Sequence, residues 1–153
     1  DMAAVKSAAL RQPDWKFVLI GRIENRAVLA LKELPNVVLS GEAPHSELAA
    51  HLADFDVALI PFLVNELTVA ANPIKLYEYL SFGLPVVSTR LPEVEMFGDL
   101  VYIAGGPEDF ARKVEEAAGE NDSLLRQRRA DSVRGETWAS RVRQIEEALA
   151  SRV

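Results

Sequence analysis

Short apolar runs alternate with segments of helical periodicity along the chain, and this alternation constrains the fold more than any other feature. The runs are continuously apolar instead of alternating in polarity, and they cover 16–20, 37–39, 56–60, 85–88 and 100–103. Continuous apolar strands separated by helices are typical of a parallel sheet that is covered on both faces. The sequence therefore predicts an α/β fold with a doubly wound parallel sheet, and its 153 residues predict one domain.

Helices are predicted between and after these runs, where apolar residues recur three or four positions apart. They are expected at 2–11, 24–34, 46–53, 73–82, 107–118, 122–134 and 137–150. The last two close the domain. In such a fold every strand-to-helix loop lies at the carboxyl edge of the sheet, which is where open parallel sheets bind their ligands.

The stretch 72–88 predicts a helix with clear ends, followed at once by a buried strand. Asn72 suits the N-cap, because its side-chain oxygen can accept a hydrogen bond from a free backbone N–H. Pro73 suits the first helical position, where its missing N–H is not needed. Gly83 suits the left-handed residue that follows a helix, and Pro85 prevents the helix from continuing.

Lys75 is unfavourably placed in this helix. It lies in the first turn, where the helix dipole presents positive charge. A bound anion would remove the conflict, since free N–H groups and an ammonium together form a phosphate site. Glu78 lies three residues on and shares a face with Lys75, so an ordinary surface ion pair is the alternative.

The loop that precedes this helix favours the anion site. It spans 61–72, whereas such connections normally take about 2–6 residues, and long loops are usually functional. It brings Asn65, Glu66 and Thr68 to the carboxyl edge of the sheet. We therefore expect an anionic ligand at this edge.

Composition excludes several classes of function. The net charge of −6 argues against nucleic-acid binding, and the absence of cysteine excludes disulfides and thiolate metal sites. No His, Asp or Glu cluster has metal-ligand spacing. No apolar run approaches the ~18–20 residues of a membrane span. An arginine-rich segment at 122–143 is expected to be a solvated helix face, with a docking face or peripheral contact with an anionic membrane as alternatives.

The segments DVALIPF, NELT and NPIKLYEYLSFGLPVVST resemble the nucleotide-sugar-binding half of glycosyltransferases with the two-domain GT-B architecture, most closely the retaining family 4 group. Glu78 corresponds to the second acid of that family's Glu-x7-Glu pattern, and Gly83 with 85–87 matches the turn and Pro-Val-Val that follow it. Trp138, at the start of the last helix, also fits. The resemblance implies a Rossmann-like domain over 1–153.

By this resemblance Glu78 binds the ribose hydroxyls of a nucleoside-diphosphate sugar, which suits a carboxylate because it accepts two hydrogen bonds at once. The diphosphate would lie at the helix start, on Asn72, Pro73, Ile74 and Lys75, with Lys75 and Glu78 as the catalytic groups. The nucleobase would lie near Arg22, Gly41 and Glu42. The resemblance implies no cofactor and no metal, with the nucleotide sugar as co-substrate.

The sequence departs from the family at the sugar end of the site. Ala70 stands where the first acid is expected, so either Glu66 is repositioned or other groups such as Thr68 hold the sugar. His45 has two readings, as a helix cap or a base contact, while His51 is expected to be structural. The family's phosphate-binding Arg and Lys lie near a strand that would precede residue 1. We expect that strand and an N-terminal acceptor domain in a longer protein.

The expected function is transfer of a sugar, with retention, to a glycan or lipid-linked acceptor in cell-envelope or exopolysaccharide synthesis. The expected location is the cytoplasm, at the inner face of the membrane. Two alternatives remain: a GT-B-like epimerase or hydrolase acting on a nucleotide sugar, and a non-enzymatic binding domain that docks a partner through its arginine-rich tail.

Overall fold

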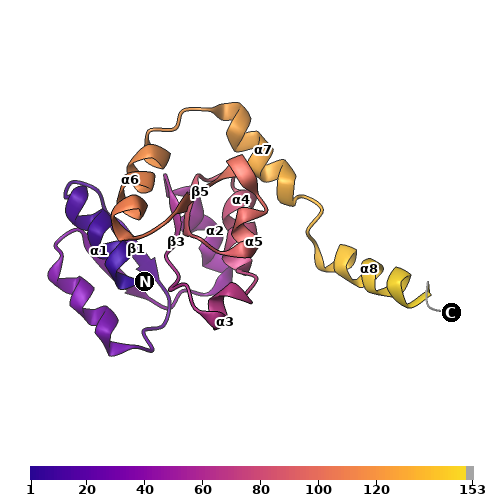
Figure 1. Cartoon of the computed structure of the whole chain (residues 1–153), viewed down its shortest axis with the longest axis horizontal. Coiled ribbons are helices and arrows are strands. Elements are labelled where there is room, and N and C mark those ends of the chain that lie inside the picture. The colour runs from indigo at the N-terminus through magenta and orange to yellow at the C-terminus, as the bar shows by residue number, and fades with distance from the viewer. Residues whose placement is uncertain (151–153) are drawn as a thin grey trace.

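Two parallel sheets lie at the centre of the protein, of which the computed structural model describes residues 1–150 (Figure 1). Strand β1 (Phe17–Ile20) pairs with β2 (Val37–Gly41). Strand β4 (Val86–Thr89) lies between β3 (Ala58–Ile60) and β5 (Val101–Ala104). The strands lie within two residues of their predicted positions, and the parallel α/β class is confirmed. They form a two-stranded and a three-stranded sheet, however, and not one continuous ladder.

Helices α1 (Met2–Arg11) and α6 (Pro107–Ala118) cover one face of the strands. Small buried side chains of α1, including Ala8, allow close approach to Phe110 and Val87 in the same core. The N-cap of α1 is the Asp1 carboxylate, which accepts from the Ala4 N–H at 3.0 Å. This face is therefore an Ala-rich helix pair packed on β-branched strand residues.

A second core fills the opposite face. Val86, the neighbour of Val87 in β4, belongs to this core because consecutive strand residues point to opposite faces. It packs with buried leucines of α4 (Ile74–Ser81), among them Leu76 and Leu80, both 0% exposed. The remaining helices that contribute here are α2 (His45–Ala53), α5 (Pro92–Glu95) and α7 (Ser123–Val133).

The helix predicted at 24–34 is a 3₁₀ helix, η1 (Arg26–Glu33). Val28, Leu31 and Leu34 pack against the first core, and they lie three residues apart. A spacing of three brings side chains onto one side of a helix with three residues per turn, whereas an α-helix turns by 3.6 residues. The prediction of a helix is confirmed, but the expected α-helical geometry is wrong.

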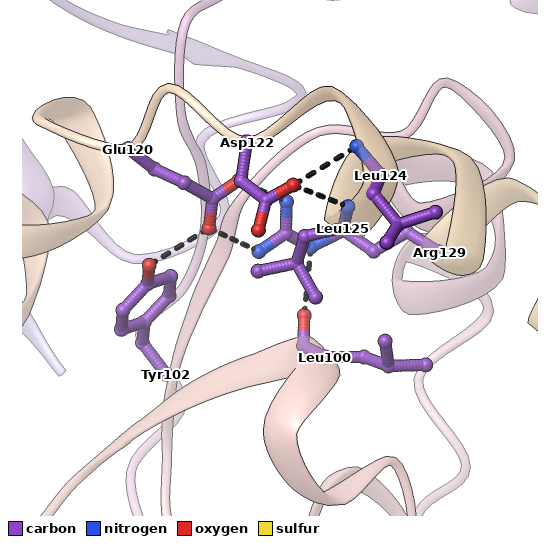
Figure 2. Close-up of polar contacts among 7 residues, drawn as sticks. All are labelled: Leu100, Tyr102, Glu120, Asp122, Leu124, Leu125 and Arg129. Carbon is purple, nitrogen blue, oxygen red and sulfur yellow. Dashed lines mark hydrogen bonds and ion pairs between the residues drawn. The ribbon is translucent and has the colours of Figure 1, made fainter.

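One arginine of the segment predicted to be solvated is completely buried. Arg129 of α7 is 0% exposed, and its guanidinium makes two contacts with the Glu120 carboxylate, at 2.5 and 2.6 Å (Figure 2). Its Nε donates to the Leu100 carbonyl at 2.8 Å, and the Tyr102 hydroxyl donates to Glu120 at 2.8 Å. Through these contacts the cluster connects α7 to the end of α6 and to β5.

The buried cluster fixes the charges of its members. Burial by itself would raise the pKa of Glu120, but hydrogen bonds from Arg129 and Tyr102 and the arginine charge outweigh it and lower that pKa. Burial, followed by the hydrogen bond to Glu120, raises the pKa of Tyr102 to about 12. Glu120 is therefore ionised and Tyr102 neutral near neutral pH.

Helix α8 (Trp138–Ala150) extends away from the rest of the molecule (Figure 1). Trp138 is 84% exposed, and the apolar side chains that follow it along the same side, Val142, Ile145 and Leu149, are exposed too. Within residues 1–150, no helix is long and apolar enough to cross a membrane.

Candidate donor-binding site

The carboxyl ends of β1 and β2 bring together three residues that the sequence assigned to the nucleobase. The Gly21 N–H donates to the Gly41 carbonyl at 2.7 Å, and Arg22 Nε lies 3.5 Å from Glu42 Oε1. Gly41 has a φ of +80°, a conformation that a residue with Cβ rarely adopts. Arg22, Gly41 and Glu42 therefore lie together at the carboxyl edge, as predicted.

Helix α4 begins one residue later than predicted. Pro73 is its N-cap, with a ψ of 101°, and Ile74 is the first helical residue. The predicted Asn72 cap is wrong, because Asn72 lies outside the helix and its Nδ2 contacts the Tyr77 hydroxyl at 3.3 Å. No side chain caps this helix start. The Leu76 N–H donates to the Pro73 carbonyl at 2.9 Å, so the N–H groups of Ile74 and Lys75 are the ones available to an anion.

The predicted end of α4 is confirmed. Gly83 has a φ of +70°; its N–H donates to the Leu80 carbonyl at 2.8 Å, and the Leu84 N–H donates to the Tyr79 carbonyl at 3.2 Å. This pair of bonds is the Schellman motif. A Cβ at Gly83 would lie 2.5 Å from Arg126 Cγ, so the glycine also allows α7 to pack closely on α4.

Glu78 is contacted from two elements. Its Oε2 lies 3.4 Å from Lys75 Nζ on the same helix, and its Oε1 lies 3.4 Å from His45 Nε2 at the start of α2. The Lys75–Glu78 ion pair, which the sequence offered as the alternative to an anion site, is therefore present. The contact with His45 was not predicted, because the sequence suggested only a cap or a base contact for this residue. The one available signal was that His45 begins the helix after β2, at the same carboxyl edge.

Lys75 and Glu78 border a groove of about 80 Å³ between β1, α2 and α4. The walls are largely apolar, with Val18 and Ile20 from β1, and the half-buried His51 also lines it. Burial, followed by the Glu78 charge, raises the pKa of the neighbouring Tyr79 to about 12, so this tyrosine stays neutral. The groove thus combines a largely apolar lining with the charged groups of Lys75 and Glu78.

Asn72 faces a different cavity, on the other side of α4. This cavity has a volume of about 430 Å³ and lies between α4, α5 and the junction of α7 with α8. Tyr77 lines it beside Asn72, and the Tyr77 ring packs edge-on against Phe97 with centroids 5.8 Å apart. The structure therefore separates Asn72 from the groove that Lys75 and Glu78 border.

The long loop before α4 contains a short helix, α3 (Glu66–Val69), that was not predicted. Thr68 accepts from the Asn65 N–H at 3.0 Å, and its own N–H donates to Asn65 Oδ1 at 3.0 Å. This reciprocal capping box occupies the Thr68 side chain within the loop. Glu66 is exposed at the start of α3, and Ala70 is its C-cap.

The arrangement suits a polyol with an attached anion. A carboxylate with both oxygens at a partly exposed surface can accept two hydroxyl hydrogen bonds, while a helix start and a lysine attract a phosphate. Among residues 1–150 no group of three or more His, Asp or Glu side chains is placed to hold a metal ion.

Comparison with known proteins gives a consistent match. A family model described as glycosyl transferases group 1 matches residues 2–120. The chain is 31% identical, over 153 aligned positions, to a Bacillus subtilis (strain 168) protein named as a teichuronic acid biosynthesis glycosyltransferase, TuaH. That alignment covers 95% of this chain and 38% of the relative, so the chain spans well under half of the relative's length.

Proposed function

Because the chain belongs to the group 1 family of glycosyl transferases, we propose that it binds the donor in transfer of a sugar from a nucleoside-diphosphate sugar to an acceptor. One observation carries the proposal: a carboxylate, an ammonium and a helix start meet at the carboxyl edge of the strands. Glu78 accepts hydrogen bonds from the ribose hydroxyls. Lys75 and the N-terminus of α4 hold the diphosphate.

The chemistry assigned to this site is stabilisation of a leaving diphosphate. As the bond between the anomeric carbon and the diphosphate breaks, its electron pair passes to the leaving phosphate oxygen. Lys75 Nζ and the positive end of the α4 dipole stabilise that charge, which is greater in the transition state than in the bound donor. We propose that the sugar is transferred with retention and that the reaction needs no metal.

We propose that the nucleobase lies at the ends of β1 and β2. Arg22, Gly41 and Glu42 lie together there, and His45 joins this region to Glu78. A nucleotide that extends from α4 to β2 would cross the apolar groove between α2 and α4. This placement is supported by the position of Arg22, Gly41 and Glu42 at the carboxyl edge, where open parallel sheets bind their ligands.

We propose that a longer protein supplies the acceptor site and a further strand between β1 and β3. One observation supports the strand: among residues 1–150, β1 and β2 form one sheet and β3, β4 and β5 form another. The acceptor is a glycan or a lipid-linked glycan of the cell envelope, bound in the cytoplasm at the inner face of the membrane.

Isothermal titration of the full-length protein against UDP, GDP and ADP tests the proposal. We expect one of the three to bind, and binding to weaken when Glu78 or Lys75 is replaced. Absence of binding to all three would contradict a donor site. Product analysis with the cognate nucleotide sugar separates a transferase from a hydrolase or epimerase, because only a transferase requires the acceptor.

A further inference from the structure

His45 and Glu78 meet across two elements that are far apart in the sequence. His45 is the first residue of α2, and Glu78 lies in the middle of α4, yet His45 Nε2 is 3.4 Å from Glu78 Oε1. Lys75 contacts the other oxygen, Oε2, at the same distance. Each oxygen of this carboxylate therefore has its own basic neighbour.

The two contacts differ in origin. A lysine three residues before a glutamate meets it on any helix, so the Lys75 contact follows from spacing alone. The His45 contact requires α2 to begin beside α4. The charged residues nearest to His45 in the sequence are Glu47, on the same helix, and Glu42, which pairs with Arg22.

The side chains of His45 and Glu78 differ in their exposure to solvent. The His45 side chain is 87% exposed, whereas that of Glu78 is 25% exposed. A pair with one partner this exposed contributes little to the stability of the fold. It can, however, fix an orientation, because the last torsion of a glutamate side chain is broad and otherwise leaves the carboxylate plane free.

We propose that His45 is a positioning residue that holds the Glu78 carboxylate in the plane required by a vicinal diol. A ribose meets the carboxylate through two hydroxyls, so both oxygens must face it together. Contacts at both oxygens before the ligand arrives lower the cost of ordering the side chain. The inference rests on the proposed binding of a nucleoside diphosphate at Glu78.

The test measures the part of the affinity that depends on the diol. Whichever of UDP, GDP and ADP binds the full-length protein most tightly is compared with its 2′,3′-dideoxy analogue by titration calorimetry. The variants are His45→Ala, His45→Gln and the matched control Glu47→Gln, which alters an exposed charge on the same first turn of α2. Thermal unfolding checks that each variant is folded.

We expect the natural protein to prefer the diol form by at least about tenfold, the low end for one hydrogen bond to a charged group. His45→Ala reduces this preference to about threefold or less. His45→Gln retains most of it, because the glutamine Nε2 can contact Glu78 Oε1 from a similar position. Glu47→Gln leaves it unchanged.

Two results overturn the inference. If His45→Ala weakens the diol and dideoxy forms equally, His45 contacts another part of the nucleotide. If the variant changes neither, the contact has no role in binding. Both differ from failure of the proposed function itself, in which the natural protein binds none of the three nucleoside diphosphates.

Discussion

Glu120 and Glu78 are both carboxylates with basic neighbours, but they lie in opposite surroundings. Arg129 contacts Glu120 at 2.5 and 2.6 Å, and both side chains are almost fully buried. Lys75 and His45 contact Glu78 at 3.4 Å from exposed positions. The contacts of Glu120 are short and closed to solvent, and the Tyr102 hydroxyl makes a further one (Figure 2). The contacts of Glu78 are longer, and both of its basic partners are exposed to solvent.

The difference indicates which cluster stabilises the fold and which one can bind a ligand. In the Glu120 cluster the carboxylate and the guanidinium satisfy each other, so removal of one partner leaves a buried charge alone. The Glu78 cluster can add a ligand beside Lys75 and His45, because the Glu78 side chain is still 25% exposed. We therefore expect substitutions in the first to change stability and substitutions in the second to change binding.

The largest effect is expected for Arg129→Met, which leaves the ionised Glu120 without its partner. It should lower the free energy of unfolding by about 3–5 kcal/mol, measured by urea denaturation. The control is Arg128→Met, which removes an exposed ion pair with Asp99 at 2.9 Å and should cost about 1 kcal/mol or less. Equal losses in the two variants would contradict the importance of burial.

A smaller loss of stability is expected for Gly83→Ala, at the point where α7 packs on α4. An alanine would have an unfavourable positive φ, and its Cβ would overlap Arg126. Strain and overpacking together should cost about 2–4 kcal/mol in urea denaturation. Gly135→Ala is the control, since no atom lies within 4 Å of a Cβ built there. An unaffected Gly83→Ala would refute the close contact.

Glu78→Gln should act on binding instead. Loss of the charged acceptor is expected to weaken binding of the cognate nucleoside diphosphate by about 2 kcal/mol. Stability should change by no more than about 0.5 kcal/mol. Calorimetric titration and urea denaturation of the same preparation check both. A large loss of stability with unchanged binding would place Glu78 in the same class as Glu120.

A smaller effect on stability is expected from acidification, which acts on the Glu120 cluster. The pKa of Glu120 is lowered in the folded protein, so its stabilising contribution is present above the pKa of an unfolded glutamate. The contribution is lost as the pH falls through the lower native pKa. Urea midpoints between about pH 7 and 3 should therefore fall more steeply for the natural protein than for Glu120→Gln. Parallel curves would show that the cluster is not linked to proton binding.

Local patterns in the sequence predicted much of this molecule. The five strands follow from continuous apolar runs, and the end of α4 follows from Gly83, because both depend on neighbouring residues. The Lys75–Glu78 contact follows from helical spacing. The wrong cap at Asn72 is an error of one residue at an element boundary, where Pro73 can occupy either the cap or the first turn.

The features that the sequence did not predict depend on tertiary packing. Arg129 lies in a segment with five other arginines, and composition does not distinguish the one that packs against Glu120 and β5. The His45 contact needs α2 and α4 to lie side by side. Such placements arise from packing between distant segments, which the periodicity of the sequence does not reveal.

Backbone and side-chain NMR of the protein titrated with UDP, GDP and ADP tests the central claim most directly. For the nucleotide that binds, we predict the largest shifts in the amides of residues 74–78 and 41–45, with the Arg129 Nε signal unmoved. Shifts concentrated at Arg129 and β5, with α4 unaffected, would contradict the assignment of Glu78 as the open, ligand-binding carboxylate and Glu120 as the closed, structural one.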